Sequence, residues 1–203
     1  MRKKGKLIVF EGLDKSGKET QAKLLVNFLL KKGYDVIYED EPTSSNPIGL
    51  FIKGWLNKEH DIKSGKAIAL LYTADRYEHL ETRILPALSN GKIVILDRYY
   101  YSTMAYENAL YGVDISWIEQ VNKFATIPDL VIYLKVRPEE CMRRARIMGE
   151  QDRHEKLELL RRVEKIYEDI SRLYRNFIVI NGEGNVNEIF DYIKRIVETK
   201  LKI

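Results

Sequence analysis

The sequence predicts an α/β fold, a three-layer αβα sandwich built on a five-stranded parallel sheet. Three observations lead to this prediction. Short apolar runs alternate with longer stretches of helical pattern, the runs are rich in Ile, Val and Leu, and the first run leads into a turn that contains glycine and lysine. Continuous apolar strands are typical of parallel sheets that helices cover on both faces. Ligands of such sheets bind at the carboxyl ends of the strands.

The predicted elements alternate along the whole chain. Five runs are expected to be buried strands because they are short and apolar; they cover residues 7–10, 36–38, 93–96, 130–134 and 177–180. Eight longer stretches carry helical patterns, at residues 17–32, 47–57, 64–89, 102–110, 116–124, 138–148, 155–175 and 186–201. No repeat, low-complexity segment or long linker interrupts them, so residues 1–203 are expected to form one domain, with working loops at 41–46 and 149–154.

The first strand and helix are joined by a predicted phosphate-binding loop. Gly12 and Gly17 let the backbone curl so that successive N–H groups point at oxyanions, and Lys18 adds a mobile cation. The helix that begins near Gly17 presents its positive end to the same place. A triphosphate is the expected ligand. The alternative is a plain strand-turn-helix corner, but the apolar strand and the amphipathic helix around the motif favour the nucleotide site.

One position departs from the usual phosphate-loop pattern. The residue after Lys18 should be Ser or Thr, whose hydroxyl binds magnesium, but it is Glu19, followed by Thr20. We therefore expect Mg²⁺ to be held mainly by phosphate oxygens and water, with Glu19 in the outer shell and Thr20 on an inner phosphate.

The composition fits a compact enzyme. With 203 residues, of which 45% are hydrophobic, the chain can bury one good core. The net charge of +4 is modest and basic residues are interleaved with acidic ones, so no nucleic-acid binding is expected. The single cysteine, Cys141, excludes an internal disulfide and a multi-cysteine zinc site, and is expected in the core. No signal-like or membrane-spanning run is found, so we expect a cytoplasmic protein without membrane contact.

A second polar group follows the strand at 93–96. Asp97 and Arg98 end this strand, and they should lie beside the phosphate loop if the two strands are neighbours. Asp97 can then orient magnesium through water while Arg98 binds a phosphate. Asp14, inside the loop, is close enough to contact an acceptor sugar. The alternatives are an Asp-Arg pair that only caps the next helix, and Asp14 as a turn or cap residue.

Aromatic residues suggest a nucleoside pocket. Tyr72 and Arg76 are four residues apart and share one helix face, so they can stack on a base and hydrogen-bond it, although such a pair is also common in ordinary surface packing. A tyrosine cluster follows Arg98, at Tyr99, Tyr100, Tyr101 and Tyr106. These rings can line a pocket or pack under the sheet, and we expect some of each.

Four arginines gather near a short glycine-containing loop: Arg143, Arg144, Arg146 and Arg153. A mobile basic segment can deliver positive charge to a moving phosphoryl group and exclude water as the site closes. The alternative is a solvated basic helix face paired with the neighbouring glutamates. His60, His79 and His154 have no partner pattern and are expected to be structural.

Together these motifs resemble the thymidylate kinase family over nearly the whole chain. The matching residues are Phe10 to Asp14, Gly17-Lys18 and Thr20; Glu41-Pro42; Tyr72, Ala74 and Asp75-Arg76; Asp97-Arg98-Tyr99, Ser102-Thr103, Ala105 and Tyr106; Pro128-Asp129-Leu130; Pro138-Glu139-Glu140; and Arg144-Ala145-Arg146 with Asp152-Arg153 and Glu155. The resemblance implies a P-loop NTPase-like nucleoside monophosphate kinase architecture and a homodimer. It also implies magnesium-dependent transfer of the ATP γ-phosphoryl to dTMP, giving dTDP.

The resemblance also implies roles for individual residues. Lys18 would hold the donor phosphates, within an ATP site formed by Gly12, Leu13, Asp14, Lys15, Ser16, Gly17, Lys18, Glu19, Thr20 and Arg144. The dTMP site would be Asp14, Pro42, Tyr72, Arg76, Arg98, Ser102, Thr103 and Tyr106, in a segment of about 41–76 and the helix after Arg98. In it Asp14 would take the sugar 3′-hydroxyl, Arg98 the phosphate, Tyr72 and Arg76 the thymine, and Tyr106 would crowd the 2′ position.

The family places its transition-state arginine either in the phosphate loop or in the lid, here about residues 143–155. The loop position holds Lys15, so the resemblance implies a lid arginine, Arg153 or Arg146, with Lys15 as a partial substitute. The predicted catalytic set is therefore Lys18, Asp14, Arg98, Arg153, Arg146 and Lys15. The segment around Glu41-Pro42-Thr43-Ser44 lacks the arginine that relatives often carry on one side or the other of this proline, so the acceptor phosphate would depend more on Arg98.

Two other functions remain open at this point. One is a deoxynucleoside monophosphate kinase of broader specificity. The other is a nucleotide-gated switch that binds ATP without transferring phosphate, in which Glu19 marks lost catalysis.

Overall fold

The computed structural model describes residues 5–149 and 154–202. Its strands are β1 (Lys6–Glu11), β2 (Val36–Asp40), β3 (Ile93–Asp97), β4 (Leu130–Lys135) and β5 (Phe177–Asn181). Its helices are α1 (Lys18–Lys31), α2 (Pro47–Leu56), α3 (Gly65–His79), the π-helical η1 (Leu80–Ile84), α4 (Leu85–Ser89), α5 (Tyr100–Tyr111), α6 (Ile115–Val121), α7 (Pro138–Ile147), α8 (His154–Leu173) and α9 (Val186–Leu201). Each predicted strand and helix is present, with ends shifted by a few residues.

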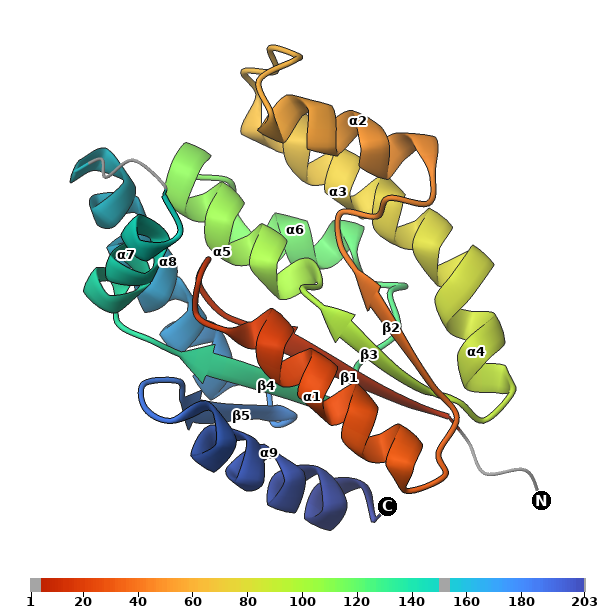
Figure 1. Ribbon diagram of the computed structural model, residues 1–203. Coiled ribbons are helices and arrows are strands. Elements are labelled where there is room, and N and C mark those ends of the chain that lie inside the picture. The colour runs from red at the N-terminus through yellow and green to blue at the C-terminus, as the bar shows by residue number, and fades with distance from the viewer. Residues whose placement is uncertain (1–4, 150–153, 203) are drawn as a thin grey trace.

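The five strands form one parallel sheet in the order β2-β3-β1-β4-β5, which confirms the predicted fold class. The central strand β1 lies between β3 and β4 (Figure 1). Phe10 pairs with Asp97, and the Arg98 amide donates a 2.9 Å hydrogen bond to the Phe10 carbonyl. The carboxyl ends of β1 and β3 are therefore level, as the predicted site requires.

Helices cover both faces of the sheet. The side chains of the central strand pack alternately into two hydrophobic cores, one on each face. Leu7 and Val9 pack with buried residues of α3, α5, α6 and α8 on one face. Ile8 and Phe10 pack with α1 and α9 on the other. The strand period of two sends successive side chains to opposite faces, and because both faces are covered every position in the run is apolar. Helices α1 and α9 lie together in front of the sheet in Figure 1.

The long helix predicted for residues 64–89 is interrupted. It consists of α3, the π-turn η1 and α4 in direct succession, and the Leu85 amide bonds to the Leu80 carbonyl five residues back. Pro86 has no N–H to donate to the carbonyl of Thr82, and its ring would press on that carbonyl in a regular α-helix. A π-turn just before the proline relieves this conflict.

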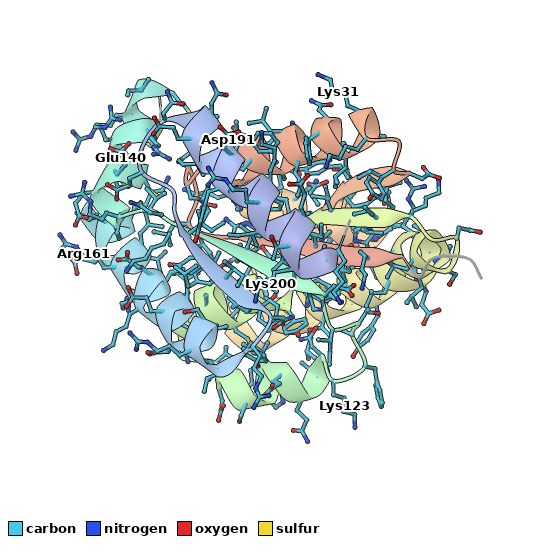
Figure 2. All side chains as sticks on the ribbon, turned by 90° about the horizontal axis from the view of Figure 1, so that it is seen from below. Lys31, Lys123, Glu140, Arg161, Asp191 and Lys200 are labelled. Carbon is cyan, nitrogen blue, oxygen red and sulfur yellow. The ribbon has the colours of Figure 1, made fainter. Side chains whose placement is uncertain are left out.

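The outer surfaces carry charges of both signs. Figure 2 shows the labelled Lys31, Arg161, Asp191 and Lys200 on the outer sides of α1, α8 and α9.

Cys141 is buried and has no disulfide partner, and burial raises the pKa of its thiol to about 12. None of the helices in residues 5–149 and 154–202 is long and apolar enough to cross a membrane.

Candidate active site

The loop between β1 and α1 has the curled backbone expected of a phosphate-binding turn. Gly12 has φ +153° and Gly17 has φ +94°, and Lys15 between them also has a positive φ of +65°. A Cβ on Gly12 would lie 2.8 Å from the carbonyl oxygen of Leu134, so a side chain there would collide with β4. Gly17 is the N-cap of α1, so the positive end of a 14-residue helix opens at the loop.

A cavity of about 870 Å³ lies over this loop. The loop from Asp14 to Thr20 forms one side of it. The opposite side is formed by α7, the residue that follows it and the turn after β5; the residues there include Glu140, Arg143, Arg144, Met148, Gly182 and Gly184. We call this space the donor cavity. It brings together seven of the nine loop residues predicted to bind ATP, together with Arg144. Gly12 and Leu13 shape the turn behind it.

Arg144 ties three segments of the donor cavity together. Its guanidinium donates to the carbonyl oxygens of Ser16 at 2.8 Å and Gly182 at 3.1 Å, and its Nε donates to Glu140 at 2.8 Å. The planar fork of arginine suits such a bridge between backbone carbonyls and a carboxylate. Arg144 therefore holds the phosphate loop in place as well as lining the cavity.

Lys18 and Asp97 face one another across the sheet edge. The Nζ atom of Lys18 lies 3.8 Å from Oδ1 of Asp97, and both residues are buried. Burial raises the pKa of Asp97, against the opposing charges of Lys18 and Arg98. Burial and the charge of Arg98 lower the pKa of Lys18, while Asp97 and Asp14 raise it. Oδ1 of Asp97 accepts no hydrogen bond from the described residues, so it can still take a donor.

A smaller cavity of about 300 Å³ adjoins this pair and is acidic. Its lining consists of four acidic residues, two basic residues and a tyrosine: Glu19, Asp40, Glu41, Asp97, Lys18, Arg98 and Tyr38. No group of three or more His, Cys, Asp or Glu side chains within residues 5–149 and 154–202 has metal-binding geometry. The expectation that phosphate oxygens and water supply most of the magnesium ligands stays a prediction.

A third cavity, of about 210 Å³, lies on the other side of Asp14. We call it the acceptor cavity. All eight residues predicted to bind dTMP line it: Asp14, Pro42, Tyr72, Arg76, Arg98, Ser102, Thr103 and Tyr106. Glu41, Tyr99 and Glu107 line it as well, and so do the apolar side chains of Trp55, Leu56 and Leu110, which were not predicted. Since Asp14 lines both the donor and the acceptor cavity, the two spaces meet at the phosphate loop.

Arg98 stands at this meeting point in a strained backbone. Its φ is +71°, a conformation that costs a non-glycine residue about 1 kcal/mol or more. The guanidinium donates to Ser102 Oγ at 2.9 Å and to the Gly12 carbonyl at 3.3 Å, forms an ion pair with Asp14, and lies over the ring of Tyr106. The positive φ turns the chain sharply after β3 and places the arginine over the loop.

Arg76 is more enclosed than its helical spacing suggested. Its exposed fraction is 1%, and its guanidinium donates to Glu41 at 2.9 Å, to Asn122 at 2.7 Å and to Thr103 at 3.2 Å. It also lies over the ring of Tyr99. Three of its five N–H groups are engaged, which leaves two for a ligand at the cavity wall.

The residue before Arg76 anchors the acceptor loop. Asp75 is 1% exposed and accepts hydrogen bonds from the amide of Thr43 at 2.9 Å and from its hydroxyl at 2.6 Å. Asn46 also donates to Asp75. The Glu41–Pro42 peptide bond in this loop is cis. Two consecutive residues of α3 thus fix both ends of the 41–46 loop, so the pocket wall is preformed.

Sequence reasoning gave no role to Glu11. This residue links β1 to α5 and α8 beneath the two cavities. Its buried carboxylate accepts hydrogen bonds from the Tyr99 amide at 2.9 Å, the Ser102 hydroxyl at 2.6 Å and the Tyr167 hydroxyl at 2.8 Å. Burial raises its pKa to about 7, although these bonds and the charge of Arg98 oppose the shift. A charged residue inside an otherwise apolar strand was the available signal.

The predicted lid is only partly within the described chain. Arg146 is exposed in the last turn of α7 and is not among the described residues that line the donor cavity. Arg143 lines the cavity and pairs with Glu140 at 2.6 Å. Arg153 lies outside the described residues. His79 lies between Glu39 and Glu41, and its structural role stays a prediction.

Comparison with known proteins agrees with this geometry. A family model described as thymidylate kinase matches residues 10–193. A probable thymidylate kinase from Pyrococcus horikoshii is 41% identical over 203 residues, which covers 98% of both chains. A thymidylate kinase from Desulfotalea psychrophila is 40% identical over 98% of this chain and 95% of its own. Another, from Caldicellulosiruptor saccharolyticus, is 33% identical over 98% of both chains.

Proposed function

Since the chain belongs to the thymidylate kinase family and catalyses the ATP-dependent phosphorylation of dTMP to dTDP, we propose that ATP occupies the donor cavity and dTMP the acceptor cavity. The observation that carries this proposal is that Asp14 lines both cavities. Phosphoryl transfer needs the donor and acceptor to meet in line, with their charges neutralised, and little other chemistry from the protein. A cleft with phosphate-binding groups at its junction meets that need.

In the donor cavity, the amides of the phosphate loop and Lys18 bind the β- and γ-phosphates of ATP. This assignment is supported by the positive end of α1 and by the hydrogen bond through which Arg144, in the facing wall, holds the Ser16 carbonyl of the loop. Thr20, one residue later than usual, lines the same cavity and binds an inner phosphate.

In the acceptor cavity, Arg98 binds the phosphate of dTMP and Asp14 accepts a hydrogen bond from the sugar 3′-hydroxyl. Tyr72 stacks on thymine, and the free N–H groups of Arg76, with Thr103, bond its edge. Tyr106 leaves no room at the 2′ position, which disfavours ribonucleotides. The hydroxyl of Tyr106 already accepts a 3.2 Å hydrogen bond from the Asp14 amide, which fixes its position.

Magnesium is the cofactor we propose. The residues present can hold the ion through water molecules. Oδ1 of Asp97 is buried without a hydrogen-bond partner among the described residues, and Glu19 lines the same acidic space. Asp97 would hold the ion through water and Glu19 would lie in its outer shell. Held there, Mg²⁺ would supply positive charge that offsets the negative charge of the phosphates during transfer. Every protein contact to it would be indirect.

We propose further that a lid of about residues 143–155 supplies the charge that stabilises the transferring group, from Arg153 or Arg146 with help from Lys15. The segment of about 41–76 forms the acceptor side of the single domain.

The enzyme is proposed to be cytoplasmic and homodimeric. Leu50, Phe51 and Leu70 on α2 and α3 expose 56%, 41% and 47% of their surfaces, which a second subunit would cover. Light scattering after size exclusion tests the dimer.

The experiment that tests the substrate assignment is a coupled assay of ADP release with ATP, Mg²⁺ and one monophosphate at a time. We expect fast turnover with dTMP and dUMP and little with dCMP, dAMP or dGMP. Comparable rates with all five would indicate a kinase of broader specificity. Binding of ATP without ADP release for any acceptor would indicate a nucleotide-gated switch.

A further inference from the structure

Three buried oxygen atoms next to Arg98 lie within hydrogen-bond distance of one another. Oε2 of Glu11 is 2.6 Å from Oγ of Ser102 and 2.8 Å from the hydroxyl oxygen of Tyr167. The two hydroxyl oxygens are 2.7 Å apart. Glu11 and Tyr167 are fully buried, and Ser102 is buried as well. We call these three side chains the oxygen triangle; β1, α5 and α8 supply one each.

The oxygen triangle has three sides, but its two hydroxyl groups supply only two protons. A hydrogen bond needs one proton between its two oxygens, and Ser102 and Tyr167 carry one each. Nη1 of Arg98 donates to Ser102 at 2.9 Å, but that proton lies on the bond to Arg98 and serves no side of the triangle. If Glu11 is ionised, one pair of buried oxygens faces each other without a proton, whichever way the hydroxyls turn. A proton on Glu11 gives each side one hydrogen bond.

The second carboxyl oxygen of Glu11 indicates where this proton resides. Oε1 accepts the Tyr99 amide at 2.9 Å, so it acts as the carbonyl oxygen of a neutral acid. Oε2, which belongs to the triangle, then carries the proton. Oxygen positions alone do not say which atom of a pair donates, so the count of protons decides this point.

Titratable groups face Glu11 from each element packed around it. They are Lys18 on α1, Arg98 and Tyr99 after β3, Tyr133 on β4, Tyr100 on α5 and Tyr167 on α8. The two cations favour the ionised form of Glu11. The tyrosines are uncharged at neutral pH, because burial raises the pKa of each phenol. Burial has the largest effect on Glu11 and raises its pKa to about 7, so both forms are accessible near neutral pH.

The charge on Glu11 changes how strongly the protein holds Arg98. With Glu11 neutral, the carboxylate of Asp14 is the ion-pair partner of Arg98. With Glu11 ionised, a second negative charge attracts the same guanidinium. An acceptor phosphate competes with these carboxylates for Arg98, so it binds more tightly when Glu11 is neutral. Linkage requires the converse, and a bound phosphate favours the proton on Glu11.

Resting on the proposed binding of the dTMP phosphate by Arg98, we propose that Glu11 is a positioning residue whose proton closes the oxygen triangle and leaves the charge of Arg98 to the acceptor phosphate. Glu11 lines none of the cavities described above, so it acts through Arg98 and Ser102 rather than on the substrate. The proton comes from solvent when dTMP binds and stays on Oε2 during phosphoryl transfer.

The first test counts the protons taken up when dTMP binds. Calorimetry at pH 7.5 in buffers of different ionisation enthalpy gives this number. Because only about a quarter of a group that titrates at about 7 is protonated at pH 7.5, the wild type should take up as much as about 0.7 proton per dTMP. The phosphate of dTMP can only release protons on binding a cation, so uptake comes from the protein. A wild type that takes up no proton between pH 7 and pH 8 would overturn the inference.

Glu11→Gln is the decisive variant. Its amide group offers N–H donors to Ser102 and Tyr167 while its carbonyl accepts the Tyr99 amide, so the triangle is complete without a titrating proton. Its proton uptake should fall below that of the wild type by as much as about 0.7 proton per dTMP. Other groups titrate in both enzymes and cancel in the difference. Equal uptake by the two enzymes would place the proton elsewhere and overturn the inference.

Glu164→Gln is the matched control. Burial also raises the pKa of Glu164, which lies on α8, but this residue lines none of the cavities described above. Glu164→Gln should take up as many protons as the wild type. A thermal melt establishes that Glu11→Gln is folded, and the wild-type count decides alone if it is not.

The second test is the pH dependence of the KM for dTMP. If only the neutral form of Glu11 leaves Arg98 to the phosphate, the ratio of wild-type to Glu11→Gln KM should rise about tenfold between pH 6 and pH 8, with little change in the ratio of kcat values. At pH 6 the two KM values should be nearly equal. A Glu11 that serves only as an ionised brace would give Glu11→Gln a raised KM at both pH values and a constant ratio.

These tests also separate this inference from the proposed function. A wild-type enzyme that binds no dTMP and releases no ADP with it would refute the proposed acceptor site, and with it the inference. A wild type that binds and phosphorylates dTMP without proton uptake would refute the inference alone.

Discussion

Arg98 and Asp14 form an ion pair across the junction of the two cavities. Arg98 follows β3 and Asp14 belongs to the loop after β1, so the pair joins the ends of two neighbouring strands. The charge of Arg98 holds the pKa of Asp14 below its ordinary value although burial opposes this. In the absence of substrate, each group thus keeps the other charged and oriented. An acceptor phosphate competes with Asp14 for the same guanidinium.

Replacing Arg98 should therefore damage acceptor use far more than donor binding. We expect Arg98→Ala to lower kcat/KM for dTMP by about 100-fold or more, as loss of a charge-assisted phosphate contact should. The Kd for ATP should change much less, because Lys18 and the loop amides remain. Steady-state kinetics with varied dTMP and direct ATP titration measure the two effects.

Arg98→Gly is the informative companion to this variant. Glycine accepts the φ of +71° without strain, so Arg98→Gly should be more stable to urea than Arg98→Ala while losing as much activity. An Arg98→Ala enzyme with near-normal kcat/KM for dTMP would remove Arg98 from the acceptor site.

Asp97 should control the metal requirement. In Asp97→Asn, the amide replaces an anion that has an unpaired oxygen toward the acidic space, so a water-bridged Mg²⁺ should bind more weakly. Loss of such an outer-shell contact typically weakens metal affinity by about 10-fold or more. Activity measured against Mg²⁺ concentration at saturating ATP should show a half-maximal concentration raised by about that factor. Asp40→Asn, on the exposed side of the same space, serves as the control.

An unchanged metal requirement in Asp97→Asn, together with a loss of stability, would mean that Asp97 acts only as the partner of Lys18. Lys18 Nζ and Asp97 Oδ1 are 3.8 Å apart, which is close enough for an ion pair that stabilises the fold. The two outcomes differ because a structural role alters unfolding without altering the metal dependence.

The proposed lid leads to a prediction about three basic residues. Arg146 and Lys15 belong to the described residues, and Arg153 lies outside them. Arg153→Ala should lower kcat by about 100-fold if its charge stabilises the transferring group, and Arg146→Ala or Lys15→Ala should have a smaller effect. Arg161→Ala is the control, since Arg161 is exposed on α8 and pairs with Glu139 and Glu158. Pre-steady-state measurement of the chemical step decides among them. Equal, small losses in all three would place the transition-state charge elsewhere.

The features that sequence predicted well are those governed by local rules. Strand β1 and the turn from Gly12 to Gly17 were predictable because continuous burial demands apolar residues and a curled loop demands glycine. Parallel neighbours bring their carboxyl ends together, so the sequence predicts Asp97 and Arg98 beside the loop on the condition that the two strands are neighbours, and the strand order meets that condition.

What sequence could not supply is the identity of distant partners. The spacing of Tyr72 and Arg76 predicts a shared helix face, but nothing local shows that Glu41 and Asn122 engage Arg76 from segments 35 and 46 residues away. The same holds for Glu11, whose hydroxyl donors Ser102 and Tyr167 lie 91 and 156 residues away. Arg153 remains untested for another reason, since it lies outside the described residues.

A final prediction concerns His79, which joins β2 to α3. Its Nε2 lies 3.3 Å from Glu39 and its Nδ1 lies 3.5 Å from Glu41, the carboxylate that also binds Arg76. Burial opposes protonation of His79, but the contacts with Glu39 and Glu41 raise its pKa from 6.5 to about 9. Protonated His79 thus stabilises the folded state. This contribution is complete below pH 6.5 and is lost as the pH rises through about 9.

Between about pH 6 and pH 9.5, the free energy of unfolding should therefore fall in the wild type by up to roughly 3 kcal/mol more than in His79→Gln, at 1.36 kcal/mol per pKa unit. Urea unfolding at several pH values measures both curves, and the contributions of other titrating groups cancel in the difference. His60→Gln is the control, because His60 stacks on Phe51 at the surface and no ion pair of His60 is found among the described residues. If His79→Gln follows the wild-type curve over this whole range, His79 is neutral in the folded protein, and the pair of glutamates must be held by Arg76 and Arg83 alone.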